Sequence, residues 1–236
     1  MDTLPSSMGS YGYYSMFSGC KSLIKSPTFT FSMNSSLGDG NYYAYMFEKC
    51  TSLTDVSNIT IAGAGKLSCA YMFSGCTNLT VPPKITANMS WGTGLSCYTF
   101  MFNNCTNLTT APTLPATKLD TSCYARMFNG CKNLVTAPEL PATTLGTYSY
   151  RYMFNGCNKL NYIKAMFTTT PGSATTGWVT NVASNGIMVK NINATWTNTG
   201  ANARPAAWTE LYYNPSTGKY YLSDKTTECD DHGNVI

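Results

Sequence analysis

The sequence predicts a repeat solenoid, an elongated stack of short coils in which each coil packs on the next. The first observation is a string, Met-Phe-x-x-Cys-x-x-Leu, that returns six times, at 16–23, 46–53, 72–79, 101–108, 127–134 and 153–160. The second is its spacing, because successive copies begin 30, 26, 29, 26 and 26 residues apart. A nearly fixed period of this size indicates one supersecondary unit stacked on copies of itself. We therefore expect about six coils whose apolar residues are buried only against neighbouring coils.

The residues before each cysteine predict one turn of 3₁₀ or α-helix. Tyr98, Met101 and Phe102 are spaced i, i+3 and i+4, which places them on one face of such a turn. Tyrosine occupies the position three before Met in five copies, and Cys69 occupies it in the other. We expect the Met, Phe, Cys and Leu of every copy to face inward, contributing about 0.8 kcal/mol for each buried methylene.

The residues after each cysteine predict a short strand that runs into a turn. Residues 108–114 are rich in threonine and are followed by Pro115, a composition typical of an extended segment. Prolines within or beside this segment, such as Pro112 and Pro138, cannot donate to a sheet ladder. The sheet along the solenoid should therefore be narrow or locally interrupted.

Most of the cysteines occupy one position of the repeat and predict a structural ladder. Its members are Cys20, Cys50, Cys76, Cys105, Cys131 and Cys157. Equivalent positions of adjacent coils should lie about 5 Å apart, so the ladder is a stack of small buried side chains. Disulfides between neighbours are sterically possible, but they would only tie coils together in pairs, and we expect thiols.

The pattern decays after Leu160 and predicts a β-rich C-terminal cap. Residues 186–190 and 211–213 have the composition of strands, and 212–221 predict a hairpin because Pro215 and Gly218 bracket a turn between aromatic pairs. The tryptophans of this part should cover the open core of the last coil. We accordingly divide the chain into a solenoid, 1–165, and a cap or attachment segment, 166–236.

The repeat resembles the BspA-like leucine-rich repeats of bacterial surface proteins, over about residues 3–165. Their unit has an Ala-Phe-x-x-Cys-x-x-Leu core followed by a strand and Ile-Pro; here Met-Phe replaces Ala-Phe, and Leu-Pro stands at 114–115 and 140–141. The resemblance implies a right-handed leucine-rich-repeat-like coil that serves in adhesion. Similar arrays with a Gly-Trp-Val ending, as at 177–179, also look like parts of phage fibre or virion proteins, so the resemblance implies a bacterial cell surface or a phage virion.

Several classes of function find no support in the sequence. With one histidine, His232, no triad and no histidine-based metal site can be built in the repeats, and the terminal Cys229-Asp230-Asp231-His232 is a short polar end. We expect no enzyme, no metal and no cofactor. The 15 basic residues are scattered rather than clustered, which argues against nucleic-acid binding. No apolar run approaches a membrane span of about 20 residues, and the N-terminus shows no secretory signal.

Two functional hypotheses remain open. The first is a recognition or adhesion module whose solenoid face binds a protein or glycan on a cell surface. Its candidate surface combines threonines of the predicted strands with a row of tyrosines: Thr109, Thr110, Thr136, Tyr98, Tyr124 and Tyr150. The tyrosines have an alternative role as packing residues. The second hypothesis is a structural phage fibre or capsid-decoration protein that associates with other chains of a particle and has no ligand of its own.

Overall fold

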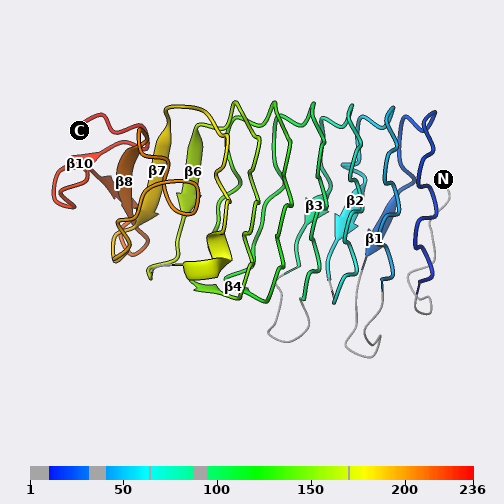
Figure 1. Ribbon diagram of the computed structural model, residues 1–236, viewed down its shortest axis with the longest axis horizontal. Helices are drawn as coiled ribbons and strands as arrows, with labels where there is room; N and C mark the ends of the chain where they lie inside the picture. The colour runs from blue at the N-terminus through cyan, green and yellow to red at the C-terminus, as the bar shows by residue number, and fades with distance from the viewer. Residues whose placement is uncertain (1–10, 32–40, 64, 88–94, 170) are drawn as a thin grey trace.

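The computed structural model is an elongated stack of coils. It describes residues 11–31, 41–63, 65–87, 95–169 and 171–236. Figure 1 shows the coils side by side along the longest axis of the molecule, with the colour advancing steadily from one end to the other. The predicted repeat solenoid with short strands and about six turns is therefore confirmed.

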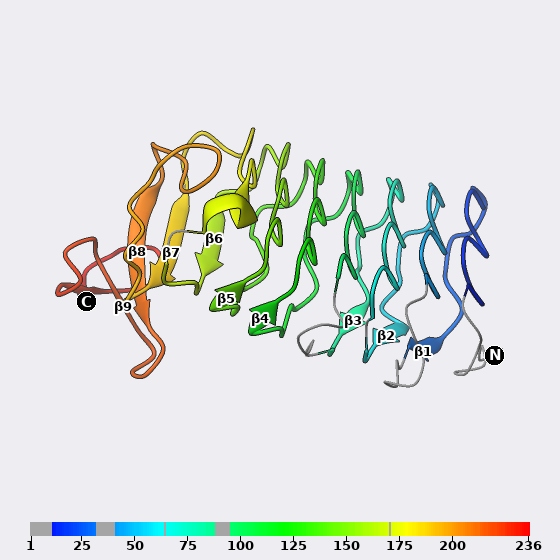
Figure 2. The ribbon, with the colours of Figure 1, turned by 60° about the horizontal axis from the view of Figure 1, so that its bottom comes forward.

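Regular β-structure occupies only a small part of each coil. The strands of the earlier coils are two or three residues long and pair in parallel with their neighbours. They are β1 (Phe29–Phe31), β2 (Ile59–Ile61), β3 (Lys84–Ile85), β4 (Lys118–Leu119) and β5 (Thr144–Leu145). Figure 2 shows them in a line along one side of the stack. Because β1-β2-β3 form one sheet and β4-β5 another, the sheet is narrow and interrupted, as the prolines predict.

The strands lie further along each coil than the sequence predicts. Residues 108–114, all of them described, contain no strand, and β4 begins only after Pro115. Elsewhere the equivalent segment makes single parallel bridges, as between Asp55 and Val81. The prolines explain the difference, because Pro112 has no N–H to donate to a ladder in this segment.

The backbone around each Met-Phe pair is a series of tight turns. Alternate N–H groups bond within the coil, as Met101 N–H does to Tyr98 O at 3.1 Å. The N–H groups between them cross to the next coil, as Phe102 N–H does to Met127 O at 2.9 Å. The segment therefore combines the i→i−3 bonds of a 3₁₀ turn with a parallel ladder to its neighbour.

A positive φ at every fourth residue keeps these turns from becoming a helix. In one coil the values are 53° at Ser96, 56° at Phe100 and 59° at Asn104. A left-handed residue cannot continue a right-handed helix, so the alternate N–H groups stay available for the next coil. The structure here differs from the helical turn expected from the i, i+3, i+4 spacing, although Tyr98, Met101 and Phe102 do all face inward.

The inward residues form ladders that run along the whole solenoid. From the second coil on, the Met, Phe, Cys and Leu of every string are 0 % exposed. Consecutive phenylalanines, hereafter the phenylalanine ladder, stack with ring centroids 5.2–5.8 Å apart and interplanar angles of 6–9°. Its members are Phe17, Phe47, Phe73, Phe102, Phe128 and Phe154. This ladder is the centre of the hydrophobic core.

Each cysteine of the predicted ladder after the first ties its coil to the preceding one. The thiol donates to the carbonyl oxygen of the preceding Phe at 3.0–3.1 Å, as Cys131 Sγ does to Phe102 O. A small side chain with a weak S–H donor suits this buried carbonyl. All ten cysteines carry thiols. Cys20 is exposed, because no described coil precedes its own.

The stack continues beyond residue 165 into a five-stranded sheet. β6 (Tyr162–Ala165), β7 (Ile187–Asn191) and β8 (Thr209–Asn214) remain parallel, while β9 (Lys219–Tyr221) and β10 (Glu228–Cys229) are antiparallel. A single 3₁₀ turn, η1 (Gly172–Thr175), precedes β7. The strands predicted at 186–190 and 211–213 and the hairpin at 212–221 are confirmed. The pairing changes at β8–β9, rather than at the expected boundary of 165.

Three tryptophans close the core at this end. Trp178, Trp196 and Trp208 are at most 2 % exposed. Each indole N–H donates to a backbone carbonyl 25 to 29 residues away, at 2.7–3.1 Å. Trp178 also contacts the last ring of the phenylalanine ladder, Phe154, with centroids 6.4 Å apart. The tryptophans thus pack over the last coils, as their position in the sequence predicts.

Candidate functional site

The three tyrosines expected on the binding surface are buried in the core. Tyr98, Tyr124 and Tyr150 are at most 1 % exposed, and their rings stack on one another at 5.7 and 6.2 Å. Burial raises the pKa of all three phenols, and none of their hydroxyls has a hydrogen-bond partner. Their assignment to a binding surface is therefore wrong. They are packing residues because the tight turns around each Met-Phe pair point them inward with Met and Phe.

The three threonines of the expected surface are exposed. Thr109 and Thr110 directly follow the buried Leu108, and Thr136 pairs through its backbone with Tyr162. They lie after the cysteine in the coil, whereas the tyrosines lie before it and point inward. The structure consequently does not bring the threonines and these tyrosines together in one surface.

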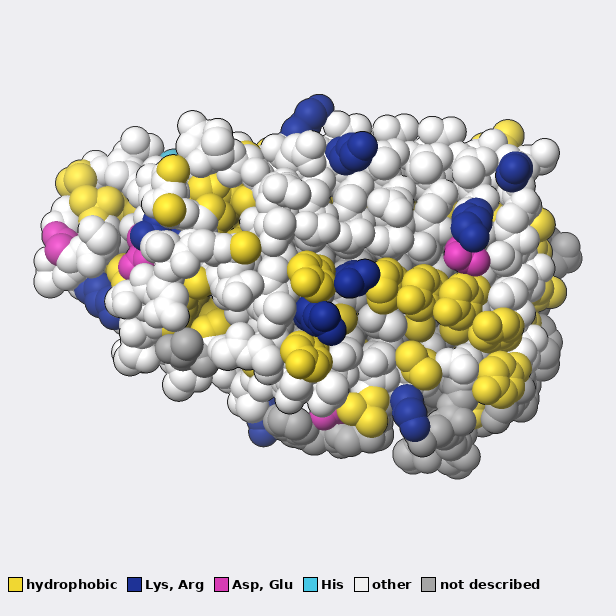
Figure 3. Space-filling model, viewed as in Figure 1, with side chains coloured by type: hydrophobic (Ala, Val, Ile, Leu, Met, Phe, Trp, Pro, Cys, Tyr) yellow, Lys and Arg dark blue, Asp and Glu magenta, His cyan; other side chains and the backbone are white. Residues whose placement is uncertain are grey.

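A second set of aromatic side chains, missed by the sequence reasoning, does line the surface. It occupies the position directly before Met from the second coil on, and Tyr14, two residues before the first Met, begins it. We call these residues the aromatic row: Tyr14, Tyr45, Tyr71, Phe100, Arg126 and Tyr152. Figure 3 shows a row of apolar side chains along one face, with basic side chains at one end. Apart from the exposed Tyr14, all the members are partly exposed.

The aromatic row is a continuous stack from Tyr45 onward, whereas the Tyr14 ring is tilted by 56° against that of Tyr45. Tyr45 and Tyr71 lie 4.6 Å apart with an interplanar angle of 6°, and Tyr71 and Phe100 lie 4.4 Å apart at 10°. Arg126 takes the place of a ring, since its guanidinium carbon is 5.2 Å from the Phe100 centroid and 4.9 Å from that of Tyr152. Partial burial raises the pKa of Tyr45 and Tyr71, so both phenols are neutral at physiological pH.

The backbone of the aromatic row is strained. Tyr45, Tyr71, Phe100, Arg126 and Tyr152 all have φ between 52° and 60°, a region that favours glycine or asparagine and that costs other residues about 1–2 kcal/mol each. In the following coil the equivalent position is Gly177, with φ 63°, where an added Cβ would lie 2.2 Å from the Tyr152 ring. Glycine leaves room for that ring, and Ser15 holds the same position of the first coil with φ 54°. The fold therefore accepts a small residue at this position, and five coils carry a bulky residue instead.

The stacking decides which part of each ring a ligand can reach. Near-parallel rings about one coil apart cover each other's faces, so the edges and hydroxyls of Tyr45 and Tyr71 are what they offer to solvent. Sugar rings usually need an open aromatic face, whereas tyrosine edges and hydroxyls, together with arginine, are typical of protein interfaces. The row therefore favours a protein surface over a sugar ring.

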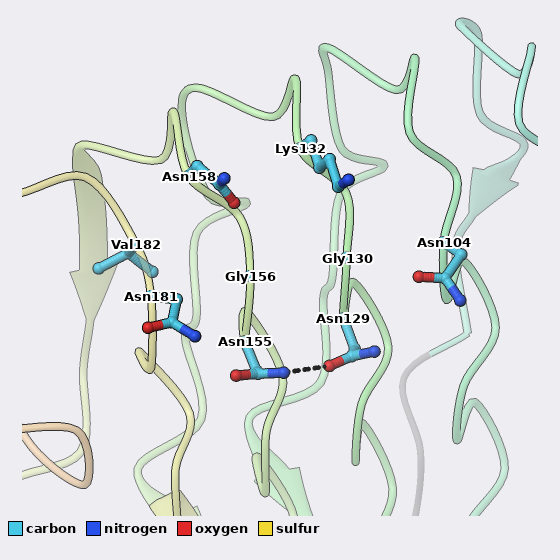
Figure 4. Close-up of a pocket in the computed structure, with 9 residues that line it drawn as sticks. All are labelled: Asn104, Asn129, Gly130, Lys132, Asn155, Gly156, Asn158, Asn181 and Val182. Carbon is cyan, nitrogen blue, oxygen red and sulfur yellow. Dashed lines mark hydrogen bonds between the residues drawn. The ribbon is translucent and has the colours of Figure 1, made fainter.

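A polar groove lies on the coil turns that follow the Met-Phe pairs. It has a volume of about 610 Å³. Its lining consists mainly of asparagine and glycine: Asn104, Asn129, Gly130, Lys132, Asn155, Gly156, Asn158, Asn181 and Val182. Figure 4 shows the amides of Asn155 and Asn129 side by side on neighbouring coils. Asn155 Nδ2 donates to Asn129 Oδ1 at 2.7 Å, and Asn129 Nδ2 to Asn103 Oδ1 at 2.7 Å. Much of the hydrogen-bonding capacity of these amides is thus used between asparagines of neighbouring coils.

No metal centre emerges from the C-terminal acidic residues. Ligand atoms of Asp230, Asp231 and His232 lie within 4.8 Å of one another. The Asp230 carboxylate already accepts hydrogen bonds from the Asn234 side chain and from backbone N–H groups, which lower its pKa. Cys229 is buried against Val189 and Leu211 and does not join the group.

Burial makes the thiols of the cysteine ladder after Cys20 poor nucleophiles. Burial raises the pKa of Cys50 to about 11 and of Cys157 to about 12. A thiolate is the form that attacks a substrate or binds a metal. These residues therefore support the fold and offer no reactive site.

Comparison with protein-family models, with curated proteins and with solved structures found no match to this chain. Among the described residues, no helix has the length and apolar character that crossing a membrane requires.

A signal for the aromatic row was present in the sequence. Tyr45, Tyr71, Phe100 and Tyr152 each directly precede a Met of the repeated string. A helical interpretation gives no reason to expect this position to point outward with a positive φ in every coil. The positive φ of Phe100 separates it from the inward Tyr98 and Phe102, whose N–H groups bond to the next coil as that of Phe100 does.

Proposed function

We propose that this protein is a non-catalytic recognition module that binds a protein surface through the aromatic row. The observation that carries the proposal is the repeated presence of bulky, partly exposed residues at positive φ. Glycine stands at the same position in the next coil, at Gly177. Backbone strain that recurs at a surface where a smaller residue is tolerated points to selection for something other than folding.

The energetics support a role outside folding. Each left-handed residue costs about 1–2 kcal/mol, while an aromatic pair contributes about 0.5–1.5 kcal/mol beyond the area it buries. The two terms nearly cancel, so the stability that the row brings to the isolated protein comes from the area that its partly exposed rings bury. Rigid, pre-stacked tyrosines lose little conformational entropy on binding, and tyrosine and arginine are enriched among residues that dominate protein interfaces. The row has the composition and the rigidity of a binding surface.

A glycan is the alternative ligand. The asparagine groove is polar and open, and side-chain amides can bond to sugar hydroxyls. Two observations argue against a glycan. The amides of Asn129 and Asn155 are already hydrogen-bonded to asparagines of neighbouring coils, and Tyr45 and Tyr71 cover each other's ring faces. We therefore place the glycan among the outcomes of the test.

The setting we propose is a bacterial cell surface or a phage virion, which rests on the resemblance of the repeats to BspA-like proteins and phage fibres. A purely structural fibre or decoration protein is the competing proposal for the same setting. Mass photometry separates the two: a recognition module can be a monomer, whereas a strict monomer over the accessible concentration range counts against a fibre subunit.

The experiment compares the wild type with a row variant, Tyr45→Asn, Tyr71→Asn and Phe100→Asn together. Asparagine tolerates positive φ, as Asn104 does in this fold, so the variant keeps the backbone and loses the rings. Both fluorescently labelled proteins are tested on bacterial and host cells with and without protease treatment, and on a glycan array. We expect protease-sensitive labelling by the wild type that the row variant loses. Labelling that resists protease, or equal labelling by both proteins, contradicts the proposal.

A further inference from the structure

One end of the aromatic row carries two arginines around a single tyrosine. The guanidinium carbon of Arg126 lies 4.9 Å from the centroid of the Tyr152 ring, and that of Arg151 lies 5.3 Å from the same centroid. Arg126 also contacts Phe100 at 5.2 Å, and Arg151 contacts Tyr148 at 4.9 Å. Each guanidinium therefore lies against two aromatic rings.

Neither arginine has an acidic partner among the described residues. The ion pairs in that part of the chain involve lysines, His232 and the third arginine, Arg204, which bonds to Glu210 at 3.1 Å. The Nε–H of Arg151 is buried without a hydrogen-bond partner, so a ligand has to approach the Nη N–H groups of that guanidinium. Two cations are thus held in place on a partly exposed surface without a counter-charge from the protein.

The stacking prepares these cations to bind a planar anion. A guanidinium presents its N–H groups along its edge, and aromatic contacts hold the plane so that less side-chain entropy is lost on binding. A carboxylate matches the fork of two parallel N–H groups and forms bidentate, charge-assisted hydrogen bonds. The chemistry of the site is therefore that of carboxylate recognition.

We propose that Arg126 and Arg151 bind an acidic side chain, aspartate or glutamate, of the protein that docks on the aromatic row. The inference rests on the proposed function and adds the charge of the partner. A sulfated glycan could also supply an oxyanion. The covered faces of Tyr45 and Tyr71 offer its sugar rings no stacking platform, whereas an acidic side chain surrounded by protein contacts suits the exposed edges.

The presence of only three arginines in the chain makes a direct test possible. The Nε–H signals of isotope-labelled protein are followed by NMR at constant ionic strength. The probes are a short poly-glutamate peptide, a neutral Gly-Ser peptide of the same length and a heparin-derived sulfated oligosaccharide. We expect poly-glutamate to shift the signals of Arg126 and Arg151 and to leave that of Arg204, which is already paired with Glu210, unchanged.

Matched variants separate geometry from charge. Arg126→Lys with Arg151→Lys keeps both positive charges but loses the planar fork, so poly-glutamate affinity should fall roughly tenfold. Lys159→Gln removes an exposed positive charge from the coil of Arg151 and should change the affinity less than about twofold.

Three results would overturn the inference: no shift at Arg126 and Arg151, equal shifts at all three arginines, or shifts with the sulfated oligosaccharide alone. None of them would touch the proposed function, because the row variant Tyr45→Asn, Tyr71→Asn and Phe100→Asn keeps both arginines and tests cell-surface binding separately. Conversely, a carboxylate site could persist in a protein whose row variant still labels cells.

Discussion

The phenylalanine ladder and the aromatic row lie two positions apart in the same chain segment, yet they have opposite roles. Phe102 is 0 % exposed and its backbone lies outside the left-handed region, whereas Phe100 is partly exposed with φ 56°. Both sets stack at nearly parallel angles, and the centroids of Tyr45, Tyr71 and Phe100 are the closer ones, at 4.4–4.6 Å against 5.2–5.8 Å in the ladder.

The comparison shows that one repeat period produces two aromatic stacks with different energetics. The phenylalanine ladder removes whole rings from water, and the hydrophobic effect of this burial stabilises the fold. The row exposes ring edges and carries backbone strain, so each of its rings contributes less to folding than a ring of the ladder does. Stacking geometry alone therefore does not tell a core from a binding surface. Exposure and backbone conformation do.

The largest expected effect comes from breaking the ladder. Phe102→Ala removes a fully buried ring stacked on Phe73 and Phe128, and we expect a loss of about 3–5 kcal/mol in the free energy of unfolding. Urea unfolding followed by circular dichroism measures it. A loss below about 1 kcal/mol, the range of surface substitutions, would show that the ladder does not carry the core.

Alkaline pH should lower the stability of the folded protein, because it favours ionisation of the buried cysteine thiols. The folded-state pKa of Cys50 is about 11 and that of Cys157 about 12, both above the unfolded value of about 8.5. A raised folded-state pKa means that the thiol contribution is fully present below the unfolded value and is lost as pH rises toward the folded one.

We therefore expect the urea midpoint to fall steadily from about pH 8 to about pH 11. In Cys157→Ala the decline should be shallower, because one ionising thiol is gone. A midpoint that stays constant over this range would contradict the burial of the thiol ladder.

A smaller effect should separate strain from stacking in the aromatic row. Tyr71→Asn loses the ring but relieves the left-handed backbone, and we expect a change within about 1 kcal/mol. Tyr71→Ala loses the same ring and keeps the strain, so it should be less stable than Tyr71→Asn by about 1 kcal/mol. Equal stability of the two variants in urea unfolding would argue against backbone strain at this position.

The repeated string made much of the fold predictable from the sequence. Its period gave the solenoid and the inward Met, Phe, Cys and Leu, and Pro215 and Gly218 gave the hairpin between β8 and β9. The prolines correctly indicated an interrupted sheet. The position of the strands was not predictable in the same way, because Pro112 moves regular pairing beyond Pro115, and this depends on which N–H groups face the next coil.

The aromatic row was harder to predict for a physical reason. Tyr98 and Phe100 lie two residues apart and are both aromatic, and only the sign of φ at Phe100 turns one side chain inward and the other outward. Residue type does not predict the positive φ at Phe100, since bulky residues rarely adopt positive φ. Aromatic residues directly before Met in several coils indicated the row. The tyrosines three residues before Met formed a second aromatic pattern, which the sequence alone did not distinguish from the first.

The most direct test of the central claim measures stability and binding on the same two variants. The row variant (Tyr45→Asn, Tyr71→Asn, Phe100→Asn) is compared with Phe102→Leu, a milder ladder change that keeps an apolar side chain. We predict that the row variant loses less stability for each ring removed than Phe102→Ala does, since strain relief offsets the lost stacking, and that it loses cell-surface labelling. Phe102→Leu should lose stability and retain labelling. A row variant that labels cells as the wild type does, while losing stability as a core variant does, would contradict the account.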